Sequence, residues 1–300
     1  MNDERLLREL RDLLRDGGLR GSFLVRDLAT GEELGIDPDR ELPVASLVKI
    51  PLAIATLERV RRGELDATRQ IEVAPGRVTS PGPTGLSRFR HPARMAVEDL
   101  LYLGLSISDS TAADALFALT PPAEVARILG ELGLEGIKVR HPMGDLEDTP
   151  VERLGPQQAR LAQELVIAAA GSGPGHPVPQ LDLARANTGT ARAFTDLLQA
   201  LWTPSAIDPA SAARIRELMG ANLLRQRLAP DFSSDAALWS SKTGTLLHLR
   251  HESGVVEHAD GQVFAVTALT ESRVAAGRQP EAEALMGRVA RALRDQLRQG

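Results

Sequence analysis

Apolar positions at helical spacing open and close this chain of 300 residues. Near the N-terminus the stripe ends at Gly17-Gly18, and a second stripe runs almost to the last residue. Each predicts an amphipathic helix, because residues three and four apart share one side of a helix. The stripe residues are Leu6, Leu7, Leu10, Leu13 and Leu14 at the start, and Ala282, Leu285, Met286, Val289, Leu293 and Leu297 at the end.

Strand-like runs lie just inside these two helices. Residues 22–28 and 33–36 flank a turn, and residues 254–259 and 262–270 flank Asp260-Gly261, so each end of the chain predicts a β-hairpin. A further strand-like segment covers residues 237–249. Antiparallel strands covered by both terminal helices predict an α+β fold.

The region between the hairpins is mainly helical in its patterning. We expect one continuous structural unit with two lobes, in which residues 1–45 and 213–300 form the sheet lobe and residues 46–212 the helical lobe. Such a chain places a cleft between the lobes. Residues 75–94, rich in proline and glycine, predict a long loop at its rim, and a helix is expected at about residues 155–170.

The candidate chemistry starts at Ser46. An extended approach ends at Pro43, and an apolar helix follows with Lys49 three residues after the serine. Both side chains then lie on one face of the first turn. A serine hydroxyl needs a base to become nucleophilic, and a lysine in a dehydrating pocket can lose its proton. The free N–H groups of a helix N-terminus favour the anion that forms after attack.

Composition strengthens this interpretation. The chain has 35 basic residues, of which only Lys49, Lys138 and Lys242 are lysines. Arginine cannot shuttle protons at ordinary pH, whereas lysine can, so a proton-transfer position resists replacement by arginine. Two of the three lysines fall in candidate motifs.

Two further motifs follow in order. Ser108-Asp109-Ser110 lies between an apolar helix at 95–107 and a helical run at 112–119, and Lys242-Thr243-Gly244-Thr245 lies in the strand-like segment. Alone, Ser108-Asp109 could simply cap the following helix. With Ser46-x-x-Lys49 they form an ordered triple that resembles the penicillin-recognising serine hydrolases, and within them the class A β-lactamase-like branch. The resemblance covers roughly residues 20–270.

The resemblance implies a two-lobed β-lactamase-like fold and a role for each motif residue. Ser46 would be the acylated nucleophile and Lys49 its activating base. Ser108 would pass a proton to the leaving group, while Lys242 would hold Ser108 and attract a substrate carboxylate.

The remaining implied roles concern substrate binding. The backbone N–H groups of Ser46 and Thr245 would form the oxyanion hole, and Thr243, Gly244 and Thr245 would line the substrate with Ser110. Arg250 follows on the next part of the chain, where it could bind a substrate carboxylate or lie in solvent as an ordinary strand arginine.

The chain departs from the family pattern at two positions. Ser110 stands where the family has asparagine, and Met143 aligns with the glutamate that positions the hydrolytic water. A methionine side chain can neither accept a proton nor orient water. Asp145, Glu147, Asp148 or Glu152 could substitute if the segment is repositioned; otherwise the acyl-enzyme should form and break down slowly. The expected helix at about residues 155–170 is extra to the family pattern, and the glycine-rich segment 171–177 after it predicts a flexible stretch.

These observations predict a cofactor-free serine hydrolase that attacks a lactam, amide or ester carbonyl, with β-lactam breakdown and antibiotic resistance as its role. One alternative is a penicillin-binding D-alanyl peptidase, an esterase or a biosynthetic acyl transferase that uses the same site. A non-enzymatic alternative is a module that binds a lactam or a cell-wall fragment.

Charge and composition exclude several other classes. The net charge of −5 argues against nucleic acid or an anionic membrane as partner, and no run of apolar residues is long enough to span a bilayer. His248, His251 and Glu252 superficially suggest a metal site, but strand residues three apart point to opposite faces, so we expect no metal. We expect a monomer, cytoplasmic from the charged N-terminus as it stands, or periplasmic or secreted if a leader has been removed.

Overall fold

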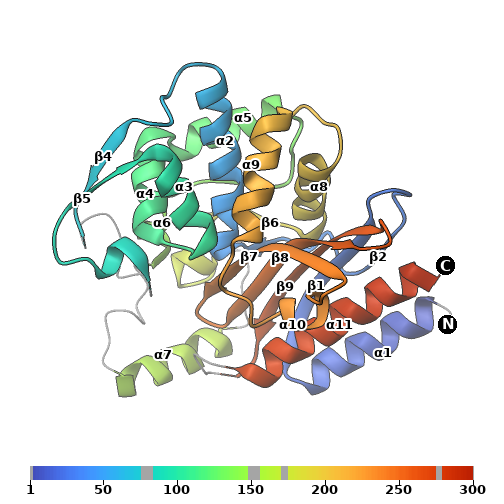
Figure 1. The fold of residues 1–300 in the computed structure, drawn as a ribbon. Helices are drawn as coiled ribbons and strands as arrows, with labels where there is room; N and C mark the ends of the chain where they lie inside the picture. Colours follow the sequence, from blue (N-terminus) through green and yellow to red (C-terminus); the bar gives the residue numbers. More distant parts are fainter. Residues whose placement is uncertain (1–2, 76–83, 148–155, 170–174, 275–278, 300) are drawn as a thin grey trace.

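A five-stranded antiparallel sheet forms the centre of the computed structural model, which describes residues 3–75, 84–147, 156–169, 175–274 and 279–299 (Figure 1). The strand order is β2-β1-β9-β8-β7, so the first and last long strands of the chain lie side by side. Both predicted hairpins are confirmed, β1 with β2 and β8 with β9. The strands are β1 Leu19–Asp27, β2 Glu33–Ile36, β7 Ala237–Leu246, β8 Leu249–His258 and β9 Val263–Ser272.

One face of the sheet is covered by the two terminal helices, α1 (Asp3–Asp16) and α11 (Pro280–Gln299), with the short α10 (Ala229–Phe232) beside them (Figure 1). Most residues of the two predicted apolar stripes are buried or half-buried and pack with Phe23, Val256 and Phe264 of the sheet. Leu13 is the exception, because it is exposed on α1. Burial of the other stripe side chains, at about 25 cal/mol per Å² of apolar surface, fixes both ends of the chain to the sheet.

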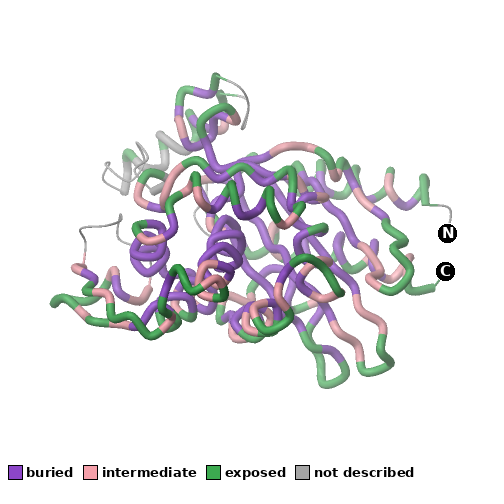
Figure 2. The backbone as a smooth tube through the Cα atoms, turned by 90° about the horizontal axis from the view of Figure 1, so that it is seen from above, coloured by how far each residue is buried: buried purple, intermediate pink, exposed green. Residues whose placement is uncertain are grey.

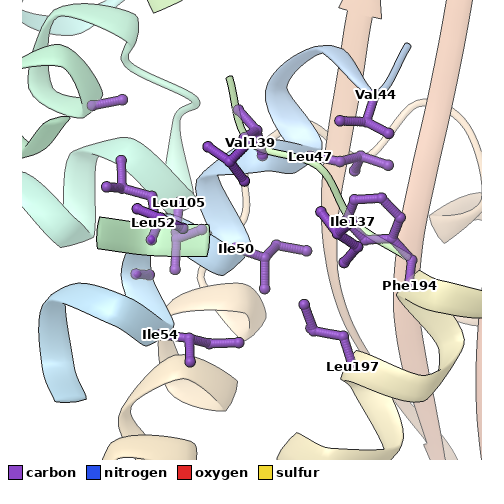
Figure 3. Close-up of a cluster of buried hydrophobic side chains, with 14 of the residues drawn as sticks. Val44, Leu47, Ile50, Leu52, Ile54, Leu105, Ile137, Val139, Phe194 and Leu197 are labelled. Atoms are coloured by element: carbon purple, nitrogen blue, oxygen red, sulfur yellow. The ribbon is translucent and has the colours of Figure 1, made fainter. Parts of the chain in front are cut away.

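The other face of the sheet carries the helical part of the chain. Helix α2 is apolar almost all round and runs through its centre, where Ile50, Leu52 and Ile54 pack against side chains from α3 and α8 (Figure 3). Seen from above, buried backbone gathers in the interior, and exposed residues lie along the outer edge (Figure 2). The helices are α2 Lys49–Arg61, α3 Val97–Ser106, α4 Ser110–Leu119, α5 Pro122–Glu131, α6 Met143–Glu147, α7 Pro156–Ala168, α8 Ala191–Trp202 and α9 Pro209–Gly220.

Short elements connect these helices. Two small ladders pair β3 with β6 and β4 with β5, and three 3₁₀ turns complete the described chain. Their bounds are β3 Leu42–Pro43, β4 Gln70–Val73, β5 Ala93–Ala96, β6 Thr188–Gly189, η1 Ala45–Val48, η2 Gly85–Arg88 and η3 Pro179–Leu181. No helix among the described residues is both long and apolar enough to cross a membrane.

Three expectations need adjustment. The strand-like segment 237–249 is not one strand, because the chain turns after β7 at Leu247, whose φ of 48° lies in the left-handed region, and β8 then begins at Leu249. The expected loop at 75–94 contains η2 and the start of β5, while residues 76–83 lie outside the described chain. The expected helix at 155–170 is present as α7, but residues 170–174 after it also lie outside the described chain. The division into lobes at residues 45 and 213 stays a prediction.

Candidate active site

Ser46 lies on a tight turn at the start of the central helix. Strand β3 ends at Pro43, Ala45 adopts a left-handed φ of 49°, and the 3₁₀ turn η1 leads directly into α2 at Lys49. The first turn is therefore 3₁₀ rather than α-helical. Ala45 and Leu47 are fully buried, whereas Ser46 is partly exposed, so a rigid apolar base holds the residue at the protein surface.

Lys49 points toward the segment between α3 and α4. Its ammonium group is 2.6 Å from the carbonyl oxygen of Ser108, 3.2 Å from the Ser108 hydroxyl and 3.3 Å from the Ser110 hydroxyl. The side chain is almost completely buried. No hydrogen bond of the Ser46 hydroxyl occurs within the described residues, so Lys49 engages the second motif rather than the serine three residues before it.

Lys242 approaches the same hydroxyl from the edge strand β7. Its Nζ donates to Ser108 Oγ at 2.8 Å and to the carbonyl of Thr243 at 2.8 Å. Burial holds the pKa of Lys242 well below its ordinary value, and the charges of Lys49 and Arg227 lower it further. The structure thus brings three predicted residues together, with the Ser108 hydroxyl between two buried amines that cannot both carry charge at low cost.

Asp109 fixes the position of Ser108. Its carboxylate caps α4 by accepting from the N–H groups of Thr111 and Ala112, and it also accepts from the N–H of Leu86 at 2.6 Å. A Cβ on Gly85 would lie 2.1 Å from this carboxylate, so only glycine fits there. The capping function considered for this motif is therefore present, and it leaves Ser108 in a left-handed conformation with φ 58°.

The glycine of the third motif allows β7 to approach the Ser46 turn. A Cβ on Gly244 would lie only 2.9 Å from the carbonyl oxygen of Val44 and 3.3 Å from the side chain of Leu47. His251, on the neighbouring strand, reaches the same turn, because its Nε2 lies 2.9 Å from the carbonyl of Pro43. Close packing of strand and turn therefore sets the position of Ser46.

Arg227 is a site-bordering residue that sequence reasoning missed. Its buried guanidinium donates to the carbonyls of Gly244 and His251 at 2.7 and 2.6 Å and to the Thr245 hydroxyl at 2.6 Å. Burial lowers its pKa. Thr245 is otherwise exposed, whereas Thr243 is buried. No motif spacing identifies Arg227, because it precedes Lys242 by 15 residues in an irregular segment; its only signal is a polar residue before an apolar run.

Arg250 is buried, so the alternative of a solvated strand arginine is wrong. Its guanidinium donates to the carbonyls of Leu247 and Leu249 at 2.6 and 2.8 Å and anchors the β7–β8 turn. Burial lowers its pKa to about 10. Its cross-strand partner is Thr245. Carboxylate binding by this residue stays a prediction.

Of the possible metal ligands on this part of the chain, Glu252 and His251 have other hydrogen-bond partners, whereas neither ring nitrogen of His248 has one among the described residues. Glu252 accepts from the N–H of Leu228, the indole of Trp239 and the hydroxyl of Ser241. The Nδ1 of His251 accepts from the N–H of Thr270 at 3.1 Å. Across the described ranges, no group of three His, Cys, Asp or Glu side chains is arranged to hold a metal ion.

Met143 begins helix α6 and is completely buried. The carboxylate of Asp114 accepts from the N–H groups of Met143 and Gly144 at 2.5 and 2.7 Å, which ties the segment to α4. Asp145 is exposed and lines a cavity of about 280 Å³ with His141. Of the other possible substitutes for the missing base, the side chain of Glu147 and the whole of Asp148 and Glu152 lie outside the described chain.

The fold and this arrangement define a class: proteins with a candidate nucleophilic serine between an antiparallel sheet and a helical region, beside a Lys–Ser–Lys cluster. The family model described as "Beta-lactamase enzyme family" matches residues 5–297. The chain belongs to this family.

Individual relatives add detail. The "Beta-lactamase regulatory protein BlaB" of Streptomyces cacaoi is 68% identical over 310 residues, covering 100% of this chain and 99% of that protein. Among solved structures, PBP-A shares 18% identity with a TM-score of 0.77, covering 99% of this chain and 97% of that one. A variant of the last common ancestor of Gram-negative bacteria class A β-lactamase shares 23% identity with a TM-score of 0.78, covering 98% and 99%. These two likenesses show the fold, and the predicted β-lactamase-like α+β class is confirmed.

Proposed function

We propose that Ser46 attacks a lactam, amide or ester carbonyl and that the resulting acyl-Ser46 hydrolyses slowly. The observation that carries this proposal is the Ser108 hydroxyl held between the buried amines of Lys49 and Lys242. Such a cluster has no evident structural purpose, because two neighbouring buried cations destabilise a fold. It suits a proton relay, in which Lys49 accepts a proton and returns one through Ser108 while Lys242 holds Ser108 in place.

In the proposed acylation, the Ser46 oxygen forms a bond to the carbonyl carbon while its proton passes to Lys49. Backbone N–H groups of Ser46 and Thr245 stabilise the oxyanion. The carbon–nitrogen bond, or the carbon–oxygen bond of an ester, then breaks, and the leaving atom takes a proton from Ser108. Ser108 regains its proton from Lys49, which is close enough at 3.2 Å. Lys242 orients Ser108 and supplies positive charge for a substrate carboxylate.

Hydrolysis of the acyl group needs a base to activate water. Met143 stands where that base is expected, and its buried thioether cannot accept a proton. The carboxylate of Asp114, which approaches this segment from α4, is engaged with the N–H groups of Met143 and Gly144. We therefore expect acylation to be much faster than deacylation.

A second candidate function is regulatory binding of a lactam or cell-wall fragment. The name of the relative that is 68% identical favours it, because that protein is called a β-lactamase regulatory protein. A long-lived acyl-serine would suit a receptor, since the modified state persists for as long as the signal requires. D-alanyl peptidase, esterase or acyl-transferase activity on the same serine are further outcomes of the same test.

The test is the intact mass of the protein after mixing with a penicillin and with a chromogenic cephalosporin, together with turnover of each. We expect a stable adduct on the wild type, none on Ser46→Ala, and little turnover. Rapid turnover without an adduct would contradict slow deacylation and favour a β-lactamase. If lactams, esters and D-amino peptides give no adduct and no turnover, Ser46 is not a nucleophile. Non-covalent binding would then remain, and calorimetry on Ser46→Ala would measure it.

A further inference from the structure

A second cavity lies on the other side of the sheet, between α10, α11 and the end of β8. Its volume is about 500 Å³, within the range of small-molecule sites. His258 at its wall pairs with Ala237, at the opposite end of β7 from Thr245, so this cavity is separate from the Ser46 site. We call it the α11 pocket; its polar lining includes Arg291, Arg294, Arg298, His258, Asp231 and Asp260.

Three arginines form one stripe of α11 along this pocket, at positions 291, 294 and 298. Arg294 is 7% exposed, and its guanidinium stacks over the ring of Phe232 at 5.2 Å from the centroid. Arginine remains charged when buried, so a buried guanidinium at a cavity wall needs acceptors. The stacking fixes the direction in which its N–H groups point.

Two guanidinium N–H donors face the imidazole of His258, which can accept only one hydrogen bond when it is neutral. The Nη1 of Arg294 lies 2.8 Å from His258 Nε2, and the Nη1 of Arg298 lies 3.0 Å from Nδ1. A neutral imidazole has one acceptor nitrogen and one N–H, whereas a guanidinium has donors only. One of the two contacts therefore sets donor against donor, and an added acceptor would relieve it.

The carboxylates nearby satisfy only part of this donor set. Asp295 accepts from Arg294 Nε at 2.7 Å and lies 3.4 Å from Arg291 Nε. Asp260 pairs with Arg298, and Asp231 lies 3.7 Å from Arg291. Each guanidinium has five N–H donors, so these contacts leave donors directed elsewhere. The hydroxyl of Ser233, also in the lining, already accepts from Arg225.

We propose that the α11 pocket binds the phosphoryl group of a small ligand between Arg294, Arg298 and His258. A phosphoryl group offers three acceptor oxygens and up to two negative charges, which match forked guanidinium donors better than a single carboxylate does. The methyl groups of Ala236, Ala237 and Ala259 provide an apolar wall for the rest of the ligand.

The test is calorimetric titration of the whole protein with inorganic phosphate and with phenyl phosphate, at constant ionic strength, with acetate as the carboxylate comparison. We expect saturable binding that is about tenfold or more weaker in Arg294→Gln and in Arg298→Gln. Arg288→Gln removes an exposed arginine of the same helix outside the pocket and should bind as the wild type does, as should Ser46→Ala. Tighter binding of phenyl phosphate than of inorganic phosphate would indicate that the ligand is an organic phosphate. Equal binding of the two would indicate that it is free phosphate.

A second measurement follows His258 by NMR. Burial and the charges of Arg298 and Arg294 lower its pKa, which Asp260 and Asp295 partly oppose. A bound phosphoryl group should raise the pKa of His258. Phosphate should not raise this pKa in Arg298→Gln. This variant also replaces Arg294→Gln if the latter does not fold. No saturable binding, equal binding of acetate, or equal weakening in Arg288→Gln would overturn the proposal. Because Ser46→Ala retains the pocket, these results are independent of acylation at Ser46.

Discussion

The Lys49–Ser108–Lys242 cluster and helix α6 differ in the proton acceptors that their side chains offer. On the β7 side, Lys49, Ser108 and Lys242 form a buried polar cluster with contacts of 2.8 to 3.2 Å. In α6, Met143 contributes only a buried thioether, and the Asp114 carboxylate beside it is engaged with backbone N–H groups. Formation and hydrolysis of an acyl-serine need different proton acceptors. One can therefore be retained without the other, as the proposed slow hydrolysis of acyl-Ser46 requires.

Replacement of Lys49, the proposed base, should have the largest effect. Lys49→Met keeps the length of the side chain but removes the amine, and the rate of adduct formation at Ser46 should fall by about 10²- to 10⁴-fold. The measurement is time-resolved intact mass with a penicillin. Lys138→Met is the matched control, because Lys138 forms an exposed ion pair with Glu41 at 2.7 Å and should acylate as the wild type does. Equal rates in all three proteins would exclude Lys49 as the base.

Adding a carboxylate at position 143 of α6 should reduce the difference between the rates of acylation and of acyl-Ser46 hydrolysis. Met143→Glu should increase the rate of acyl-Ser46 hydrolysis by about 10²-fold or more, because a positioned carboxylate can accept the proton of water. Loss of adduct after removal of free penicillin measures this rate. Met143→Leu retains the apolar character and should leave it unchanged. A folded Met143→Glu protein with unchanged hydrolysis would show that this position does not face the acyl group.

Two buried histidines bordering the β7–β8 region should make the fold acid-sensitive. Burial is the main cause that lowers the pKa of His251 and of His248 to about 4. Below pH 6.5 the unfolded chain binds protons that the folded protein does not, so stability falls as the pH drops from about 6.5 to 4. The upper limit is about 3 kcal/mol for each histidine. Urea unfolding at several pH values should show that the free energy of unfolding depends less steeply on pH in His251→Gln than in the wild type. His91→Gln, at an exposed position, should keep the wild-type dependence.

The smallest expected effect concerns the strand–turn contact. Gly244→Ala would push a methyl group to 2.9 Å from the Val44 carbonyl, so strand and turn must separate. We expect a loss of about 1 to 3 kcal/mol in unfolding free energy, together with slower acylation. Gly130→Ala, on the exposed side of α5 with no atom within 4 Å, should be neutral or slightly stabilising. Wild-type acylation in a folded Gly244→Ala protein would mean that this contact does not position Ser46.

Local pattern predicted the elements well. The leucine stripe of α1, the stripe of α11 and both hairpins lie where alternation and turn residues indicated, because each is set by neighbours within one helix or strand. Errors occurred where a local signal was ambiguous. The run 237–249 reads as one strand, but a left-handed Leu247 ends it, and no residue type such as glycine marks that turn.

For the candidate site, the order of residues predicts which chemical groups are available: the ordered serines and lysines, and a methionine where a glutamate is expected. It does not determine their contacts. Lys49 binds Ser108, and Arg227 binds Gly244, although the residues of each pair are distant in sequence. The burial of Arg250 depends on the segments that pack around it. Only the tertiary structure decides these, because a buried polar group takes its partners from whichever segments the core brings beside it.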